Sequence, residues 1–356
     1  MSRFPIQLQI ISDLHLETPI VSPAYQTFSI DAQADNLCLL GDIGLVKDDG
    51  LFAFLRATLE KSGGSRIFYV IGNHELYQNS HELAVQRLRN FENEAKAEYG
   101  GRFVLLDKKR FDIDESTTIL GCTLWSAISA DQASEAQLRL TDFNEERGIR
   151  NWSLREQLLK HKQDVDWLDA QVQELQEKEP HRQIAILTHH SPTLDPRAVD
   201  PKHQNSVLST CFATDLSSRP CWQSAMVKLW AFGHTHYNCA FIDDATQKIV
   251  VANQKGYQQM GSSGNRKIKI MLVEIDKNEW KIRKLPSRKA APLSNSLVVD
   301  MENPEADFNA DNNLIPVRQS HDTKGILNDD KIGKSIFRRA ADRLHITKRT
   351  STGFSG

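Results

Sequence analysis

Five short polar motifs come directly after runs of apolar residues in this chain. They are Asp13-Leu14-His15, Gly41-Asp42, Gly72-Asn73-His74-Glu75, His189-His190 and Gly233-His234-Thr235-His236. The apolar runs before them have the length and the Ile, Val, Leu and Phe content of buried strands. In open α/β sheets, the loops at the carboxyl ends of the strands meet in one crevice. We therefore expect carboxylate, amide and imidazole groups from five loops to converge on one site.

The side-chain types at these positions predict a metal site. They combine Asp, Asn and His, and no motif contains a cysteine. Imidazole and oxygen donors together suit Mn, Fe, Zn or Co and argue against a thiolate-rich structural zinc site. The candidate ligands are more numerous than one ion needs. Two ions about 3.5–4 Å apart, bridged by a carboxylate, would use all of them.

The ordered set of motifs resembles the calcineurin-like metallophosphoesterase superfamily. DLH, GD, GNHE, THH and GHTH follow one another between Asp13 and His236. The resemblance implies an α/β fold, a four-layer α/β/β/α sandwich, with two divalent metal ions as cofactors. It also implies hydrolysis of a phosphomonoester or phosphodiester, by in-line attack of a metal-bridging hydroxide on phosphorus.

The resemblance assigns a role to eight residues of this sequence. The ligands of the first ion would be Asp13, His15, Asp42 and His236. Asp42 would bridge to the second ion, whose remaining ligands would be Asn73, His189 and His234. His74 would protonate the leaving-group oxygen or orient the scissile phosphate, because an imidazole with a near-neutral pKa can deliver a proton.

Two details of this assignment remain open in the sequence. His190, the second histidine of the THH run, could contact substrate or take the place of His189 as the ligand. Protein serine/threonine phosphatases carry GDxVDRG, whose second Asp orients the catalytic histidine, and Leu45 stands at that position here. The protein-phosphatase subgroup is therefore not favoured. The carboxylates to consider as partners of the catalytic histidine are Asp48, Asp49 and Glu75.

Two further segments could face the substrate. Trp125–Trp152 carries arginines that could clamp a phosphate, or it packs against the domain and its arginines form surface ion pairs. Asn253–Tyr257, with the sequence NQKGY, resembles the end of the family's core, and we expect its Gly256 to serve a turn.

The elements that must position these motifs alternate between strands and helices. The predicted strands are Ile6–Ser12, Asn36–Leu40, Arg66–Ile71, Thr117–Trp125, Gln183–Thr188, Lys228–Phe232, Lys248–Asn253, Lys267–Ile275 and Glu279–Leu285. Helical spacing of apolar residues predicts helices at Leu51–Lys61 and Ser153–Lys178, the second with a capping box formed by Ser153 and Glu156. Strands that alternate with helices and then continue alone predict sheet layers with helices outside them.

The composition changes near Pro286 and predicts two regions. Residues 1–285 would form the catalytic domain, and residues 286–356 a low-complexity tail. From Pro286 to Asp330 apolar periodicity disappears, so that segment cannot bury enough surface to offset the entropy of ordering and is predicted to be disordered. Residues 331–349 are basic, with apolar residues at helical spacing. They could form a helix that contacts an anionic membrane surface or an acidic partner weakly, or could simply attract the acidic linker.

The overall composition limits the classes of function. The net charge is −2, the pI is about 6.6 and the mean hydropathy is −0.46. The core has no dense basic stripe, so a nuclease is possible but not favoured over a small-molecule phosphoesterase. No stretch is long and apolar enough for a transmembrane helix, no secretion signal is evident, and the five scattered cysteines suit a reducing, cytoplasmic location. A non-catalytic interaction module on the same fold is the other alternative.

Overall fold

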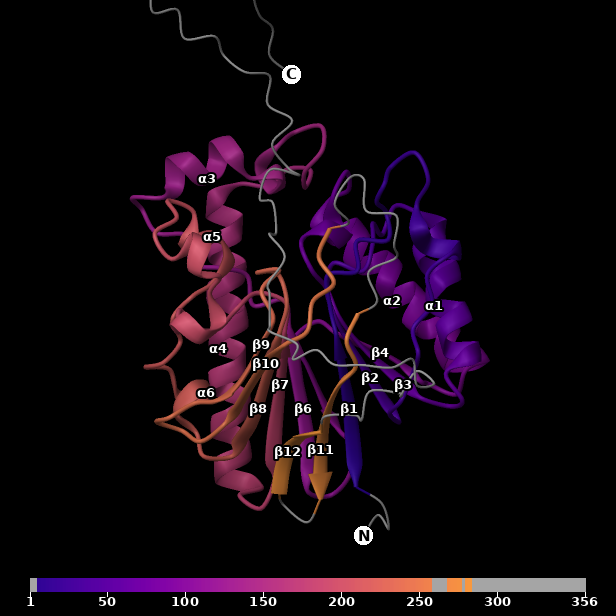
Figure 1. Ribbon diagram of the computed structural model, residues 1–356, viewed down its shortest axis with the longest axis vertical. Helices are drawn as coiled ribbons and strands as arrows, with labels where there is room; N and C mark the ends of the chain where they lie inside the picture. Colours follow the sequence, from indigo (N-terminus) through magenta and orange to yellow (C-terminus); the bar gives the residue numbers. More distant parts are fainter. Residues whose placement is uncertain (1–4, 258–267, 277–278, 284–356) are drawn as a thin grey trace, which may run out of the picture. The chain divides into compact units, whose positions relative to one another are not determined.

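Two six-stranded sheets lie at the centre of the computed structural model, which describes residues 5–257, 268–276 and 279–283 (Figure 1). The first sheet has the order β12-β11-β1-β2-β3-β4. Its strands are β1 (Ile6–Ile11), β2 (Asn36–Leu40), β3 (Arg66–Val70), β4 (Phe103–Leu106), β11 (Met271–Asp276) and β12 (Glu279–Arg283). Strands β1 to β4 are parallel, β11 is antiparallel to β1, and β12 is antiparallel to β11.

The second sheet has the order β5-β6-β7-β8-β10-β9. Its strands are β5 (Lys109–Asp112), β6 (Thr117–Cys122), β7 (Gln183–Thr188), β8 (Val227–Phe232), β9 (Cys239–Ile242) and β10 (Ile249–Ala252). The inner strands β6, β7, β8 and β10 are parallel, and the edge strands β5 and β9 are antiparallel to their neighbours. The carboxyl ends of the parallel strands therefore lie together at one edge of each sheet.

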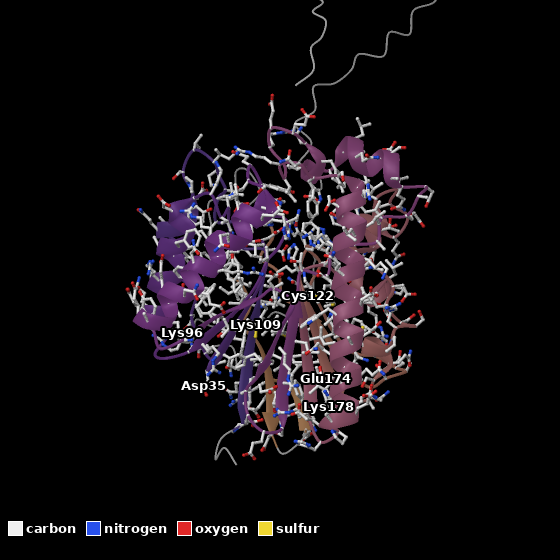
Figure 2. All side chains as sticks on the ribbon, turned by 180° about the vertical axis from the view of Figure 1, so that it is seen from behind. Asp35, Lys96, Lys109, Cys122, Glu174 and Lys178 are labelled. Atoms are coloured by element: carbon white, nitrogen blue, oxygen red, sulfur yellow. The ribbon has the colours of Figure 1, made fainter. Side chains whose placement is uncertain are left out.

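Helices cover the outer faces of both sheets. They are α1 (Asp49–Lys61) and α2 (His81–Glu98) on the first sheet, and α4 (Leu154–Lys178) and α6 (Pro220–Gln223) on the second. The short helices α3 (Ala133–Arg139) and α5 (Ser209–Phe212) share a separate, smaller apolar cluster. Figure 1 shows α1 and α2 beside the first sheet and α4 beside the second. In Figure 2, Glu174 and Lys178 mark α4 from behind, where they form an i,i+4 ion pair at 2.8 Å. None of the helices in the described residues is both long and apolar enough to span a membrane.

The alternation of side chains along the strands makes this a four-layer sandwich. In β2, Leu37 and Leu39 pack into the cluster shared with α1 and α2, whereas Cys38 and Leu40 pack into the cluster between the two sheets. Strand β7 alternates in the same way between α4 and the first sheet. Both faces of each central strand are buried, which accounts for their almost continuous apolar sequences. The predicted α/β/β/α arrangement is confirmed.

Most predicted elements are present, with differences at their ends. The predictions for β2, β7 and the carboxyl end of α1 match the structure, and Ser153 caps α4 by accepting a hydrogen bond from the Glu156 amide. The strand predicted at Thr117–Trp125 ends earlier, at Cys122, because Leu124 and Trp125 have φ angles of +72° and +45° and leave the sheet. The sequence does not predict helices α2, α3, α5 and α6 or strands β4, β5 and β9. The linker and basic segment of the predicted tail lie outside the described residues.

Candidate metal centre

The five motifs follow β1, β2, β3, β7 and β8, and their side chains converge at the carboxyl ends of these strands. Five of the seven predicted ligands have a left-handed backbone: Asp13, His15, Asp42, His234 and His236, with φ between +46° and +68°. This conformation costs roughly 1–2 kcal/mol per residue other than glycine. Such strain persists only where the surrounding structure imposes it, and its concentration at these positions indicates a functional site.

The glycines of the motifs allow the loops to approach one another closely. A Cβ on Gly72 would lie 2.2 Å from Asp42 Oδ1 and 2.5 Å from the Asp42 amide nitrogen. A Cβ on Gly233 would lie 2.7 Å from Asp13 Oδ2. Any larger residue would displace the carboxylates, so the glycines of GNHE and GHTH are required by this packing.

One group of side chains contains Asp13, His15 and His236. The Nε2 atoms of His15 and His236 lie 3.0 Å apart, and Asp13 Oδ1 lies 3.3 Å from His236 Nε2. Asp42 Oδ2 lies 4.0 Å from His15 Nε2. Asp13 and His15 are fully buried. These atoms fit the ligand set expected for a first metal ion.

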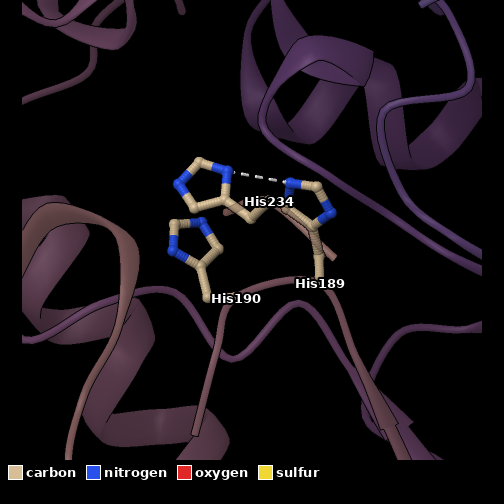
Figure 3. Close-up of side chains that lie close together, drawn as sticks. All are labelled: His189, His190 and His234. Carbon is tan, nitrogen blue, oxygen red and sulfur yellow. Dashed lines mark hydrogen bonds between the residues drawn. The ribbon is translucent and has the colours of Figure 1, made fainter. Parts of the chain in front are cut away.

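A second group contains Asp42, Asn73, His189 and His234. His189 Nε2 lies 3.1 Å from Asn73 Oδ1, 3.1 Å from His234 Nδ1 and 3.4 Å from Asp42 Oδ1. Figure 3 shows the His189 and His234 rings facing each other through these nitrogens. The donors match the expected second set, and the two oxygens of Asp42 are directed to different groups. The His and Asp residues of both groups could therefore hold divalent metal.

The protonation states favour metal binding at most of these positions. Burial raises the pKa of the Asp42 carboxyl, but the neighbouring histidines, chiefly His189 and His74, outweigh it and hold this pKa well below its usual value. Burial lowers the pKa of His234 to about 3, and it lowers the pKa of His15 as well. Carboxylates and neutral imidazoles are the forms that bind metal ions. At His189 burial is opposed by Asp42, which raises the pKa to about 9, so a metal ion would have to displace a proton there.

His74 lies beside the first group, on the short 3₁₀ turn η2 (His74–Leu76) that follows β3. Its Nδ1 is 3.0 Å from Glu17 Oε1, and its Nε2 is 3.9 Å from Asp42 Oδ2. The Tyr257 hydroxyl lies 3.0 Å from the same Nε2. The imidazole is thus held at the edge of the centre, with Nε2 directed toward Asp42.

The carboxylate on His74 Nδ1 is none of the three that the sequence suggested. Asp48 accepts a hydrogen bond from a tyrosine hydroxyl at 3.1 Å, and Asp49 pairs with an arginine of α2. Glu75 binds backbone amides instead. The contact comes from Glu17, which was missed although it follows Asp13 and His15 in the same alternating pattern. Burial raises the pKa of Glu17, but hydrogen bonds from the two histidines prevail and bring it to about 2.

Glu75 fixes the loops that carry Asp42 and Asn73. Its Oε1 accepts hydrogen bonds from the Ile43 amide at 2.8 Å and the Tyr69 hydroxyl at 2.8 Å. Its Oε2 accepts from the Asp42 amide at 2.9 Å and the Gly72 amide at 2.7 Å. Burial and the charge of Asp42 raise the pKa of this carboxyl above its usual value. The final residue of GNHE is therefore a structural clamp between two ligand loops.

Asp142 reaches the centre from the segment between Trp125 and Trp152, and was also missed. It is buried on the 3₁₀ turn η3 (Thr141–Phe143), and its Oδ1 accepts a hydrogen bond from Asn73 Nδ2 at 2.8 Å. The Tyr77 hydroxyl lies 2.7 Å from the same oxygen. Because Nδ2 donates to Asp142, Asn73 presents Oδ1 to His189. A single acidic residue in an irregular segment gives no sequence signal for this role.

His190 lies beneath the ring of His234, with ring centroids 3.9 Å apart (Figure 3). Its Nδ1 is 2.7 Å from the Ser126 hydroxyl, and its buried Nε2 has no hydrogen-bond partner among the described residues. His189, by contrast, contacts Asp42, Asn73 and His234. The geometry favours His189 as the ligand of the two. Gly256 serves a turn with φ +70° and donates its amide hydrogen to the Asp13 carbonyl.

The sequence profile of the calcineurin-like phosphoesterase family matches residues 8–238 of the chain. This stretch is more than half of the sequence and contains all five motifs. The chain belongs to the calcineurin-like phosphoesterase family. Membership makes the protein a hydrolase that acts on phosphoester bonds, and the divalent metals that the family uses agree with the clusters of His and Asp residues.

Solved structures share the fold of this calcineurin-like phosphoesterase. The phosphopantetheinyl hydrolase of Mycobacterium tuberculosis superposes with a TM-score of 0.52 at 16% identity, covering 82% of this chain and 100% of that one. Another structure covers 78% of this chain and 98% of its own at 13% identity, with a TM-score of 0.41. The first likeness shows the fold alone. None of the curated proteins compared with the chain matches it.

Proposed function

We propose that the protein hydrolyses a small phosphomonoester or phosphodiester at a binuclear metal centre. The observation that carries the proposal is the position of Asp42, whose Oδ1 lies near His189 and whose Oδ2 lies near His15. A carboxylate directed to two separate groups of donors is the arrangement that a bridging ligand requires. Asp13, His15 and His236 would complete one site, and Asn73, His189 and His234 the other.

The bound ions would neutralise the phosphoryl oxygens and lower the pKa of the attacking water. Side chains of the protein would protonate the leaving group and orient the metal ligands. His74 Nε2 faces Asp42 at 3.9 Å, so it would lie near the substrate phosphate and can protonate the departing oxygen. Asp142 keeps the Asn73 oxygen directed at the second site. Mn, Fe, Zn and Co all suit this donor set.

Metal content and turnover, measured together, test the proposal. The wild type should carry two ions per chain and hydrolyse an aryl phosphate or its diester, and a chelator should abolish this activity. Asp42→Asn should lose metal and rate together, whereas His74→Ala should keep both ions and lose most of its rate on an alkyl phosphoester, whose leaving oxygen needs a proton. Full occupancy and full rate in Asp42→Asn would overturn the assignment.

A panel of substrates would identify the class that the enzyme acts on. It should contain phosphomonoesters, cyclic nucleotides, phospholipid headgroups and dinucleotides. A phosphopantetheine phosphodiester belongs in the panel because the Mycobacterium tuberculosis protein of similar fold is a phosphopantetheinyl hydrolase. We propose a cytoplasmic location and a small-molecule substrate. Binding of DNA or RNA by the full chain at low salt would instead favour a nuclease, and tight protein binding without any hydrolysis would favour an interaction module.

A further inference from the structure

Glu17 contacts two histidines of the centre with one oxygen atom. Its Oε1 lies 3.2 Å from His15 Nδ1 and 3.0 Å from His74 Nδ1. The side chain is buried, with 6% of the residue exposed, and Oε2 has no hydrogen-bond partner among the residues that the structure describes. Burial of a carboxylate with an unsatisfied oxygen is unfavourable for folding, so a structural role alone does not account for this residue.

The hydrogen bonds to Glu17 determine which ring nitrogen carries a hydrogen in both imidazoles. A carboxylate oxygen only accepts hydrogen bonds, so each Nδ1 that contacts Glu17 must carry a hydrogen. When His15 and His74 both donate through Nδ1, the Nε2 atoms are left for the centre. His15 Nε2 does lie 3.0 Å from His236 Nε2, and His74 Nε2 lies 3.9 Å from Asp42 Oδ2.

The surrounding rings hold this arrangement in place. The two imidazoles meet edge to face with centroids 4.5 Å apart. Tyr257 stacks on His15 at 4.1 Å, and Tyr77 packs against His74 at 4.3 Å. Each imidazole ring therefore has one face packed against a tyrosine and its Nδ1 held by Glu17, so the ring has little freedom to rotate.

We propose that Glu17 is a positioning residue that sets the leaving-group acid and a ligand of the first metal ion with one carboxylate oxygen. The inference deepens the proposed function and rests on it. It assigns to Glu17 the task that the second Asp of GDxVDRG performs in the serine/threonine phosphatases. Here the partner comes from the loop after β1 rather than from the loop after β2.

The proposal specifies where the protons go. Water oxygen forms a bond to phosphorus as the bond between phosphorus and the leaving oxygen breaks, and that oxygen keeps the bonding electron pair. The leaving oxygen takes the hydrogen of His74 Nε2, while the Nδ1 hydrogen stays on His74 and remains hydrogen-bonded to Glu17. A proton from the attacking water restores His74. Glu17 thus compensates the positive charge of the protonated ring and prevents it from turning.

A double-mutant cycle separates this role from a purely structural one. We compare Glu17→Gln, His74→Asn and the double variant in the metal-loaded full-length protein, with metal content measured for each. Glu17→Gln should retain two ions and lose about 10²-fold in kcat/KM on alkyl phosphoesters, within the range of general acid catalysis. On nitrophenyl esters, whose leaving group needs no proton, the loss should be less than about 10-fold. With the metal sites saturated, so that the contact between Glu17 and His15 no longer limits occupancy, the double variant should be no slower than His74→Asn within about threefold. The remaining effect of both changes is then on the leaving-group acid.

Asp48→Asn is the matched control, since it removes a neighbouring carboxylate that contacts a tyrosine hydroxyl. It should leave the dependence on the leaving group unchanged. The proposal would be overturned if the losses in kcat/KM of Glu17→Gln and His74→Asn multiplied in the double variant. It would also be overturned if the loss for Glu17→Gln were equal for all leaving groups.

A second measurement does not depend on turnover. ¹⁵N NMR of histidine in the zinc-loaded wild type should show a hydrogen on Nδ1 of both His15 and His74. A His74 ring with bare Nδ1 would refute the role of Glu17 even if the enzyme hydrolyses phosphoesters. Conversely, absence of all hydrolysis with both Nδ1 atoms protonated would overturn the proposed function and leave the positioning of the rings by Glu17 supported.

Discussion

Removal of the Glu75 side chain should destabilise the fold strongly, because four donors converge on it. In Glu75→Ala the buried amides of Asp42, Ile43 and Gly72 lose their acceptor, and so does the Tyr69 hydroxyl. A buried donor left unsatisfied costs about 1–3 kcal/mol. The three amides alone therefore put the loss of unfolding free energy at roughly 3–9 kcal/mol, against a typical total of about 5–15 kcal/mol.

Urea denaturation in the presence of a chelator measures this loss without a contribution from bound metal. Glu75→Gln is the matched variant, because it keeps the shape of the side chain but turns an NH₂ group toward two of the donors. We expect it to lose an intermediate amount of unfolding free energy, about 1–3 kcal/mol. Metal affinity should fall in both variants because Asp42 moves with its amide. A loss below about 1 kcal/mol for Glu75→Ala would refute the reasoning.

Two more predictions follow from particular contacts, and a third concerns the tail. Asp142→Ala should weaken one of the two metal sites about 10–100-fold in a Mn titration, since Asn73 loses the partner that orients it; equal weakening of both sites would contradict this. Burial, opposed by Lys108, raises the pKa of Asp164 from its usual 3.8 to about 6. The folded state therefore favours the protonated form of Asp164. The stabilisation that this form gives to the fold is fully present below pH 3.8 and is lost as the pH rises through 6. The unfolding free energy of the wild type minus that of Asp164→Asn should accordingly fall by about 3 kcal/mol from acid to neutral pH, and a difference that rises would contradict the pKa direction. Truncation before Pro286 should leave turnover of a soluble substrate unchanged and abolish binding to anionic vesicles; a drop in turnover would show that the tail contributes to the catalytic domain.

The sequence predicts the strands and the ligand motifs well because their signals are local. Strand β7 has four consecutive apolar residues in the sequence QIAILT, and His189 follows its last residue directly. The sequence therefore shows this motif whatever the position of the strand in the sheet. Each motif needs only a strand end and a polar residue, and three of the five also contain a glycine. The order of strands in the two sheets brings the five ends together, and the resemblance to a family supplies that order.

What the sequence does not predict depends on contacts between distant segments. Asp142 lies 69 residues from Asn73, and only the fold of the intervening chain reveals the hydrogen bond between them. The strand predicted at Thr117–Trp125 ends early because Asp164 on α4 binds the Leu124 amide at 2.9 Å and the chain turns away. Glu17 could have been found, since Asp13, His15 and Glu17 alternate along one loop, but its two histidine partners become apparent only in the structure.

The central claim is a pair of metal ions bridged by Asp42, and electron paramagnetic resonance of the manganese-loaded protein tests it most directly. Two Mn ions about 3.5–4 Å apart should give an exchange-coupled spectrum at a stoichiometry of two ions per chain. Asp42→Asn should abolish the coupling. A single Mn per chain, or two ions with the spectrum of isolated Mn, would contradict the account.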